Sequence, residues 1–139
     1  MVTKQISVFI ENRKGRLGDV LDVLKASGVN ILSLSLADTS EYGLLRIISD
    51  NPQKGQEAFA NAGFSVMLTE VFILRVPHTP GSLQNILRVI ADEELSVEYM
   101  YGLSMSGQEA SIVVKISDLE KADSVFEKHG IQTLSYEAL

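Results

Sequence analysis

Residues 5–33 read QISVFIENRKGRLGDVLDVLKASGVNILS, and residues 71–99 read VFILRVPHTPGSLQNILRVIADEELSVEY. A shift of 66 residues places Gly81 on Gly15. It also aligns the alternating apolar residues before each glycine and the leucines and valines at helical spacing after it. The chain is therefore an internal duplication, and the fold of one half predicts the fold of the other.

Each half predicts the element order βαββαβ. Alternating apolar residues indicate strands, apolar residues three and four apart indicate amphipathic helices, and Gly and Pro mark the turns. In the first half we expect strands at 4–11, 30–37, 42–49 and 64–70 and helices at 16–27 and 52–61. In the second half we expect strands at 71–77, 95–104, 109–117 and 131–137 and helices at 81–93 and 118–129.

This order is that of an α+β, ferredoxin-like unit, in which two helices cover one face of an antiparallel sheet. We expect two such units, at residues 1–70 and 71–139. The leucines of 30–37 run out of step with the apolar residues of 95–104, which predicts one residue inserted just after the first helix of the second half.

The face of each sheet that the helices leave bare is expected to carry apolar residues. We place Phe9, Leu45, Ile47 and Ile73 there. Because such a surface is unfavourable in water, we expect a partner domain or subunit to cover part of it.

The composition excludes several classes of protein. The 139 residues include no Cys, so disulfide scaffolds, thiolate metal sites and cysteine nucleophiles are excluded. The net charge of -6 disfavours nucleic acid as a partner. No apolar stretch approaches the roughly 20 residues that span a bilayer, so we expect a cytoplasmic protein without a membrane partner.

The duplicated loop is the candidate site. It reads NRKGRL at residues 12–17 and HTPGSL at 78–83, in each case between a strand and a helix. A helix start offers unpaired N–H groups and partial positive charge, and glycine permits close approach, so a carboxylate could bind there. Asn12 and His78 precede the glycines by three residues and add side-chain hydrogen bonds. The alternative, that each glycine only makes a tight turn, stays open.

Both halves resemble ACT domains, βαββαβ modules whose first loop typically reads N-x-P-G-x-L. Asn12, Gly15 and Leu17 match this pattern in the first half, and Pro80, Gly81 and Leu83 match it in the second. Lys14 replaces the usual proline and His78 the usual asparagine. The resemblance covers the whole chain and is closest to the regulatory subunit of acetohydroxyacid synthase and to stand-alone pairs of ACT domains.

The resemblance implies a regulatory protein that binds an amino acid, forms a homodimer and possesses no catalytic residues, cofactor or metal. In ACT domains the ligand lies where the first loop of one domain faces the start of the second strand of a neighbour. Carried over, the site of the first half is Asn12, Arg13, Lys14, Gly15, Arg16, Leu17, Asn30, Ile31 and Leu32. That of the second half is His78, Thr79, Pro80, Gly81, Ser82, Leu83, Ser96, Val97, Glu98 and Tyr99.

Other functions fit the sequence less well. An acylphosphatase-like enzyme would need a phosphate-cradling loop with an essential arginine, and an RNA-binding domain would display aromatic residues on its central strands. The third strands instead carry Leu44-Leu45-Arg46-Ile47 and Ile112-Val113-Val114-Lys115. The remaining alternative is an interaction module that regulates a metabolic enzyme through protein contacts and binds no ligand.

Overall fold

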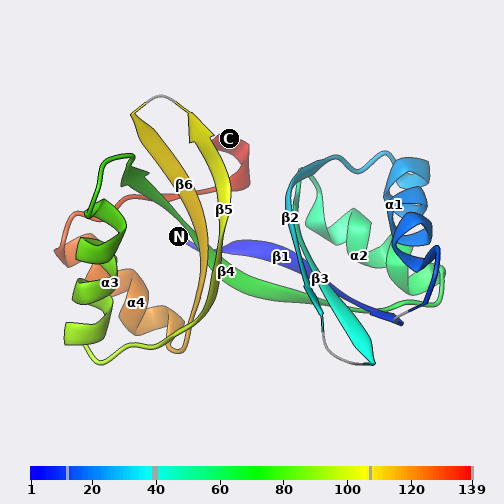
Figure 1. Ribbon diagram of the computed structural model, residues 1–139, viewed down its shortest axis with the longest axis horizontal. Helices are drawn as coiled ribbons and strands as arrows, with labels where there is room; N and C mark the ends of the chain where they lie inside the picture. The colour runs from blue at the N-terminus through cyan, green and yellow to red at the C-terminus, as the bar shows by residue number, and fades with distance from the viewer. Residues whose placement is uncertain (12, 39–40, 107, 139) are drawn as a thin grey trace. The chain divides into compact units, whose positions relative to one another are not determined.

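The computed structural model describes residues 1–11, 13–38, 41–106 and 108–138. The chain divides into two compact units. We call them the N-terminal unit (Lys4–Thr69) and the C-terminal unit (Met1–Thr3 together with Glu70–Leu139). In each unit two helices lie on one face of an antiparallel sheet, as Figure 1 shows. The α+β fold with two ferredoxin-like βαββαβ units is therefore confirmed.

The sheet of the N-terminal unit has the strand order β2-β3-β1-β4. Strand β3 pairs antiparallel with both β1 and β2, which leaves β2 at an edge. The elements of this unit are β1 (Thr3–Glu11), α1 (Arg16–Ser27), β2 (Ile31–Asp38), β3 (Tyr42–Ser49), α2 (Pro52–Asn61) and the first part of β4 (Ser65–Pro77).

The C-terminal unit repeats this order as β5-β6-β4, with β7 paired to β4. The predicted strands 64–70 and 71–77 are one continuous strand, β4. The further elements are α3 (Ser82–Asp92), β5 (Val97–Ser106), β6 (Glu109–Ile116), α4 (Leu119–Lys128), β7 (Thr133–Leu134) and the 3-10 turn η1 (Tyr136–Ala138). The prediction of a strand over all of 131–137 was therefore wrong.

Each unit has its own core between helices and sheet. In the N-terminal unit Ile6, Val8 and Ile10 of β1 pack with Val20 and Leu24 of α1. An edge-to-face aromatic pair accompanies each core, Phe59 with Phe64 at 5.7 Å between centroids and Phe72 with Phe126 at 5.0 Å. Among the described residues, no helix has both the length and the apolar character needed to cross a membrane.

The prediction that Leu45 and Ile47 lie on the bare face was wrong. Leu45 pairs with Val8 and Ile47 with Ile6. Leu45 and Ile47 are both fully buried in the core beneath the helices. Residues directly opposite in a sheet share a face, so the side chains that point away from the helices on β3 include those of Leu44 and Arg46. Phe9 pairs with Leu44 and is 45% exposed, as a bare-face position requires.

The extra residue of the second half does not follow the helix. Gly28, at the end of α1, and Glu94, at the equivalent position after α3, both have positive φ, at 73° and 61°. The offset of 66 residues thus continues into β5. A register shift between Gly102 and Ser104, which has no counterpart in β2, takes up the extra residue instead.

Candidate functional site

The glycines of the two loops have the same backbone conformation. Gly15 has φ 81° and Gly81 has φ 86°, and each is the N-cap residue of the following helix. A Cβ atom at either glycine would meet nothing within 4 Å, so positive φ and not crowding requires glycine here. Equivalent hydrogen bonds close the loops: Arg13 N–H to Glu11 O (2.8 Å) and Thr79 N–H to Pro77 O (2.9 Å), then Arg16 N–H to Arg13 O and Ser82 N–H to Thr79 O (both 3.2 Å).

The helices that follow the glycine loops begin without a side-chain cap. The other two helices are capped, since Asn51 Oδ1 accepts from Lys54 N–H at 3.2 Å and Asp118 Oδ1 accepts from Lys121 N–H at 3.1 Å. The N-terminal ends of α1 and α3 therefore keep first-turn N–H groups that no cap side chain satisfies. A bound carboxylate is a suitable acceptor for such groups.

A cleft of about 220 Å³ lies beside the first glycine loop. It is smaller than the roughly 300–1,000 Å³ typical of sites for drug-sized ligands, so a small metabolite matches its size better. We call it the N-terminal cleft, and its lining residues are Ile10, Glu11, Arg13, Arg16, Leu17, Leu36 and Gly43. These residues come from β1, the glycine loop, α1, β2 and β3.

Three charged side chains line this cleft. Arg13 Nε lies 3.3 Å from Glu11 Oε2, and both side chains are more than half exposed. Arg16 is only 20% exposed, and its guanidinium carbon lies 4.1 Å from the centroid of the Phe64 ring. The Nε atom of Arg16 is buried and has no hydrogen-bond partner. An acceptor that reached this atom would remove the cost of an unsatisfied buried donor.

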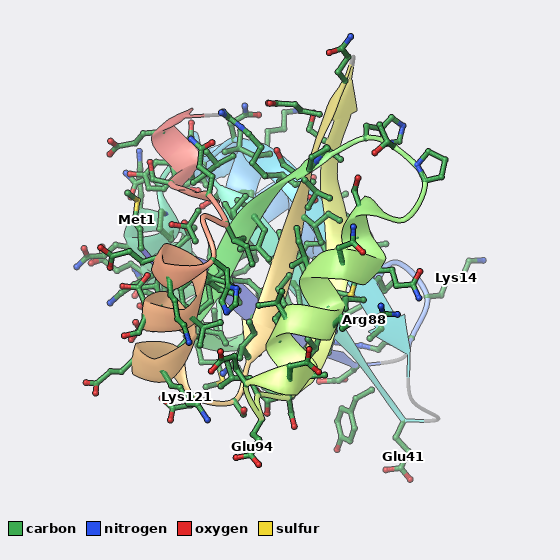
Figure 2. The ribbon with its side chains drawn as sticks, turned by 90° about the vertical axis from the view of Figure 1, so that its left-hand side faces the viewer. Met1, Lys14, Glu41, Arg88, Glu94 and Lys121 are labelled. Atoms are coloured by element: carbon green, nitrogen blue, oxygen red, sulfur yellow. The ribbon has the colours of Figure 1, made fainter. Side chains whose placement is uncertain are left out.

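The remaining residues of the first loop are placed differently. Lys14 is exposed and its side chain extends away from the ribbon (Figure 2). Asn12 lies outside the described residues. Gly15 is not among the residues that line the N-terminal cleft; it is the N-cap residue of α1.

The predicted second-strand residues Asn30, Ile31 and Leu32 lie at the opposite end of α1 from this loop. Asn30 N–H donates to Asp50 Oδ1 at 2.9 Å, and Asp50 N–H donates to Asn30 O at 3.1 Å. The 12 residues of α1 separate the two groups by about 18 Å within the unit. A single unit therefore does not bring the two predicted parts of the site together.

The second loop belongs to the C-terminal unit and carries different side chains. His78, Thr79, Pro80 and Gly81 are exposed, while Ser82 and Leu83 are half-buried. His78 N–H donates to Gln108 O at 2.7 Å, and the hydroxyls of Thr79 and Ser82 hydrogen-bond each other.

The predicted strand start of the C-terminal unit is already engaged. Ser96 N–H donates to Ser117 Oγ at 3.2 Å, the counterpart of the Asn30–Asp50 contact. The carboxylate of Glu98 pairs with Lys115 Nζ at 3.2 Å. Val97 and Tyr99 are half-buried and pair with Ile116 and Lys115 across a register shift. A ligand ammonium at Glu98 would have to compete with Lys115.

A second cleft recurs at equivalent places in both units. In the N-terminal unit it measures about 190 Å³ and is lined by Phe9, Glu11, Arg16, Tyr42, Gly63, Phe64 and Ser65. In the C-terminal unit it measures about 330 Å³ and is lined by Arg75, Pro77, Ile86, Glu109, Gly130, Ile131 and Gln132. There the guanidinium of Arg75 is already satisfied by Glu109 (3.1 Å) and Gln132 (3.1 Å).

A charged cluster joins the ends of α3 and α4. Glu93 Oε1 lies 3.3 Å from both His129 Nε2 and Lys128 Nζ. The hydrogen bonds from His129 and Lys128 hold the pKa of the Glu93 carboxyl below its ordinary value of 4.5. In the part of the chain that the structure describes, no group of three or more His, Asp or Glu side chains is arranged to hold a metal ion.

Sequence reasoning missed four residues of the N-terminal cleft: Ile10, Glu11, Leu36 and Gly43. Glu11 directly precedes the predicted loop and could have been included by extending that loop one residue. Leu36 and Gly43 reach the cleft through strand pairing, because Gly43 lies opposite Ile10 and Leu36 lies opposite Leu45. The contribution of Leu36 and Gly43 to the cleft therefore follows only from the register of β1, β2 and β3.

Comparison with known families identifies one family. The sequence profile of a family described as an ACT domain pair matches residues 1–139. Protein BT0572 from Bacteroides thetaiotaomicron has 33% sequence identity and a TM-score of 0.92, with 96% of this chain and 92% of that chain covered. No curated protein matches the sequence significantly.

Two more distant structures share the fold. The ligand-free regulatory subunit of aspartate kinase from Thermus thermophilus has 15% identity and a TM-score of 0.66, covering 89% of this chain and 88% of that chain. The regulatory subunit of aspartate kinase from Thermus flavus has 17% identity and a TM-score of 0.62, with the same coverage.

Proposed function

Because this chain belongs to the ACT domain pair family, we propose that it is a regulatory protein that binds a free amino acid at its glycine loops. The observation that carries the proposal is the N-terminal cleft. It lies at the loop that the sequence singles out, beside an uncapped helix start and a buried, unpartnered Arg16 Nε. Both are N–H groups that donate hydrogen bonds, and the carboxylate common to all free amino acids can accept them.

The proposed site comprises Arg13, Arg16 and Leu17 of the cleft, with Gly15 shaping the loop. Asn12 and Lys14 flank it in the sequence. Sites of this type are complete only when another ACT unit faces a glycine loop. The residues that then complete them are Asn30, Ile31 and Leu32 at the strand start, the second loop, and Ser96–Tyr99. We therefore include a homodimer in the proposal.

Exposed apolar side chains support the homodimer. Leu17 and Leu21 of α1 are 41% and 38% exposed, and Leu34 and Leu36 of the edge strand β2 are 47% and 50% exposed. Burial of such a surface stabilises association. Light scattering of the full chain, with and without amino acids, measures the assembly, and a monomeric mass at micromolar concentration in both cases contradicts the homodimer.

The same exposed leucines favour the second candidate function, an interaction module that regulates a separate metabolic enzyme and binds no ligand. A thermal-shift screen against the twenty amino acids separates the two functions. A ligand at about 100 times its Kd adds roughly 2.7 kcal/mol to the unfolding free energy, which raises the Tm by several degrees. A screen in which no amino acid raises the Tm contradicts ligand binding and favours the interaction module.

A further inference from the structure

The internal duplication provides a natural comparison for the N-terminal cleft. Its three charged lining residues, Glu11, Arg13 and Arg16, have uncharged residues at the equivalent positions of the C-terminal unit: Pro77, Thr79 and Ser82. The backbone hydrogen bonds donated by Arg13 and Arg16 N–H have direct counterparts at Thr79 and Ser82 N–H. The fold of the loop therefore does not require these charges, and a function of the N-terminal cleft explains them better.

The charges of the cleft suit a zwitterion. The Nε–H of Arg16 is buried without a hydrogen-bond partner, and its Nη1 lies 3.5 Å from Oδ2 of Asp19, whose side chain is 60% exposed. Asp19 lies in the first turn of α1, where a ligand carboxylate is also favoured and would compete with this exposed side chain. Glu11 is the acidic residue of the lining, and its carboxylate is more than half exposed. Its contact with the equally exposed Arg13 is an ion pair of the kind that contributes little, so an ammonium group can replace Arg13 at small cost.

The other wall of the cleft is aliphatic. Ile10 is 5% exposed, while Leu17 and Leu36 keep 41% and 50% of their surface open. Gly43 preserves space beside Leu36, because a Cβ atom there would lie 3.3 Å from Leu36 Cδ1. At the position equivalent to Leu36 the C-terminal unit has Gly102, whereas Ile10 and Leu17 have the aliphatic counterparts Val76 and Leu83. Leu36 is therefore the part of this wall that is particular to the N-terminal unit.

We infer that the N-terminal cleft selects an α-amino acid with an aliphatic side chain, an inference that rests on the proposed amino-acid binding. The carboxylate binds at Arg16 and the start of α1, the ammonium binds at Glu11, and the side chain packs on Ile10, Leu17 and Leu36. An acidic or basic side chain would bring an unpaired charge against this aliphatic wall and lose its hydration.

Calorimetric titration of the full chain with leucine, isoleucine, valine, alanine, aspartate and lysine tests the selectivity. The branched aliphatic amino acids are expected to bind at least about tenfold more tightly than alanine, because each buried methylene contributes about fourfold. Two leucine analogues test the charges: 4-methylpentanoate lacks the amine, and 3-methylbutylamine lacks the carboxylate. Each is expected to bind at least about tenfold more weakly than leucine.

Two pairs of variants locate the ligand. Arg16→Gln is expected to weaken leucine binding at least about tenfold, whereas the exposed Arg88 of α3 gives the matched control Arg88→Gln, with unchanged affinity. Leu36→Asn is expected to weaken leucine binding, whereas Met67→Asn, at a residue 51% exposed outside the cleft, is not. The analogue series needs no variant and stays decisive if Arg16→Gln does not fold.

The outcomes separate the inference from the proposed function. Tighter binding of aspartate or lysine than of leucine, abolished by Arg16→Gln, overturns the aliphatic selectivity and leaves amino-acid binding intact. Leucine binding that survives Arg16→Gln but is lost in Gly81→Val places the ligand at the second loop and also overturns the inference. Heat from none of the amino acids contradicts both.

Discussion

Alanine substitutions at Gly15 and Gly18 are expected to change stability in opposite directions, although the two glycines lie three residues apart. Gly15 has φ 81°, whereas Gly18 lies inside α1 with ordinary helical geometry. A Cβ atom at either position would meet nothing within 4 Å. Backbone conformation alone therefore decides the sign of each effect.

The magnitudes follow from the conformations. An L-residue held in the left-handed region costs roughly 1–2 kcal/mol, so Gly15→Ala should lower the free energy of unfolding by about that amount. Gly18→Ala should raise it by about 0.8–1 kcal/mol, because alanine is the better helix former and restricts the unfolded chain. Gly81, with φ 86° and equally open surroundings, should respond to alanine as Gly15 does.

Urea unfolding followed by circular dichroism at 222 nm measures these differences. If the two units unfold in separate transitions, Gly15→Ala and Gly18→Ala should move one transition and Gly81→Ala the other. A neutral or stabilising effect of Gly15→Ala would refute the left-handed loop conformation. Different costs at Gly15 and Gly81 would refute the equivalence of the two loops.

Three further predictions concern the cores and the charged cluster. Phe59→Ala should lower the unfolding free energy by about 3–5 kcal/mol in urea titrations, because Phe59 is fully buried, and a loss below about 1 kcal/mol contradicts that burial. Gly55→Ala places a Cβ atom 2.5 Å from Ile6 Cδ1, so it should be destabilising, and the added Ile6→Val change, which removes Cδ1, should recover part of the loss. Because the folded-state pKa of Glu93 is lowered, its pairing with His129 stabilises the folded state above about pH 4.5, and this stabilisation is lost as the pH falls. The difference in unfolding free energy between wild type and Glu93→Gln should therefore vanish in acid. A difference that stays constant with pH contradicts the pairing.

Local patterns were sufficient to predict the order of the elements and the positions of the helices, but not the short last strand or the continuity of β4. Gly28 was expected to end the first helix and does so, with φ 73°. Pro52 was expected in the first turn of the second helix and is its first residue. These signals depend on the backbone preferences of single residues, which act whatever the rest of the chain does.

Properties that depend on strand register could not be predicted. The segment YGLLRIIS (42–49) is apolar at consecutive positions, so its sequence does not say which side chains face the helices. Pairing of Leu45 with Val8 decides the face. The position of the extra residue is likewise invisible, because the shift between Gly102 and Ser104 lies within a strand and Glu94 adopts a positive φ that sequence reasoning assigns to glycine.

The local part of the candidate site was predicted, and the part that depends on strand register was not. The glycine loop is a local motif, and Arg13, Arg16 and Leu17 indeed line a cleft. Leu36 and Gly43 reach that cleft only through long-range pairing in the sheet.

A titration of the ¹⁵N-labelled full chain with leucine, followed by two-dimensional amide NMR, tests the central claim most directly. Binding at the N-terminal cleft predicts saturable shifts of the amide signals of Gly15, Leu17, Gly18 and Leu36, while those of Gly81 and Gly102 stay in place. Unmoved spectra at millimolar leucine, or shifts centred on Gly81, would contradict it.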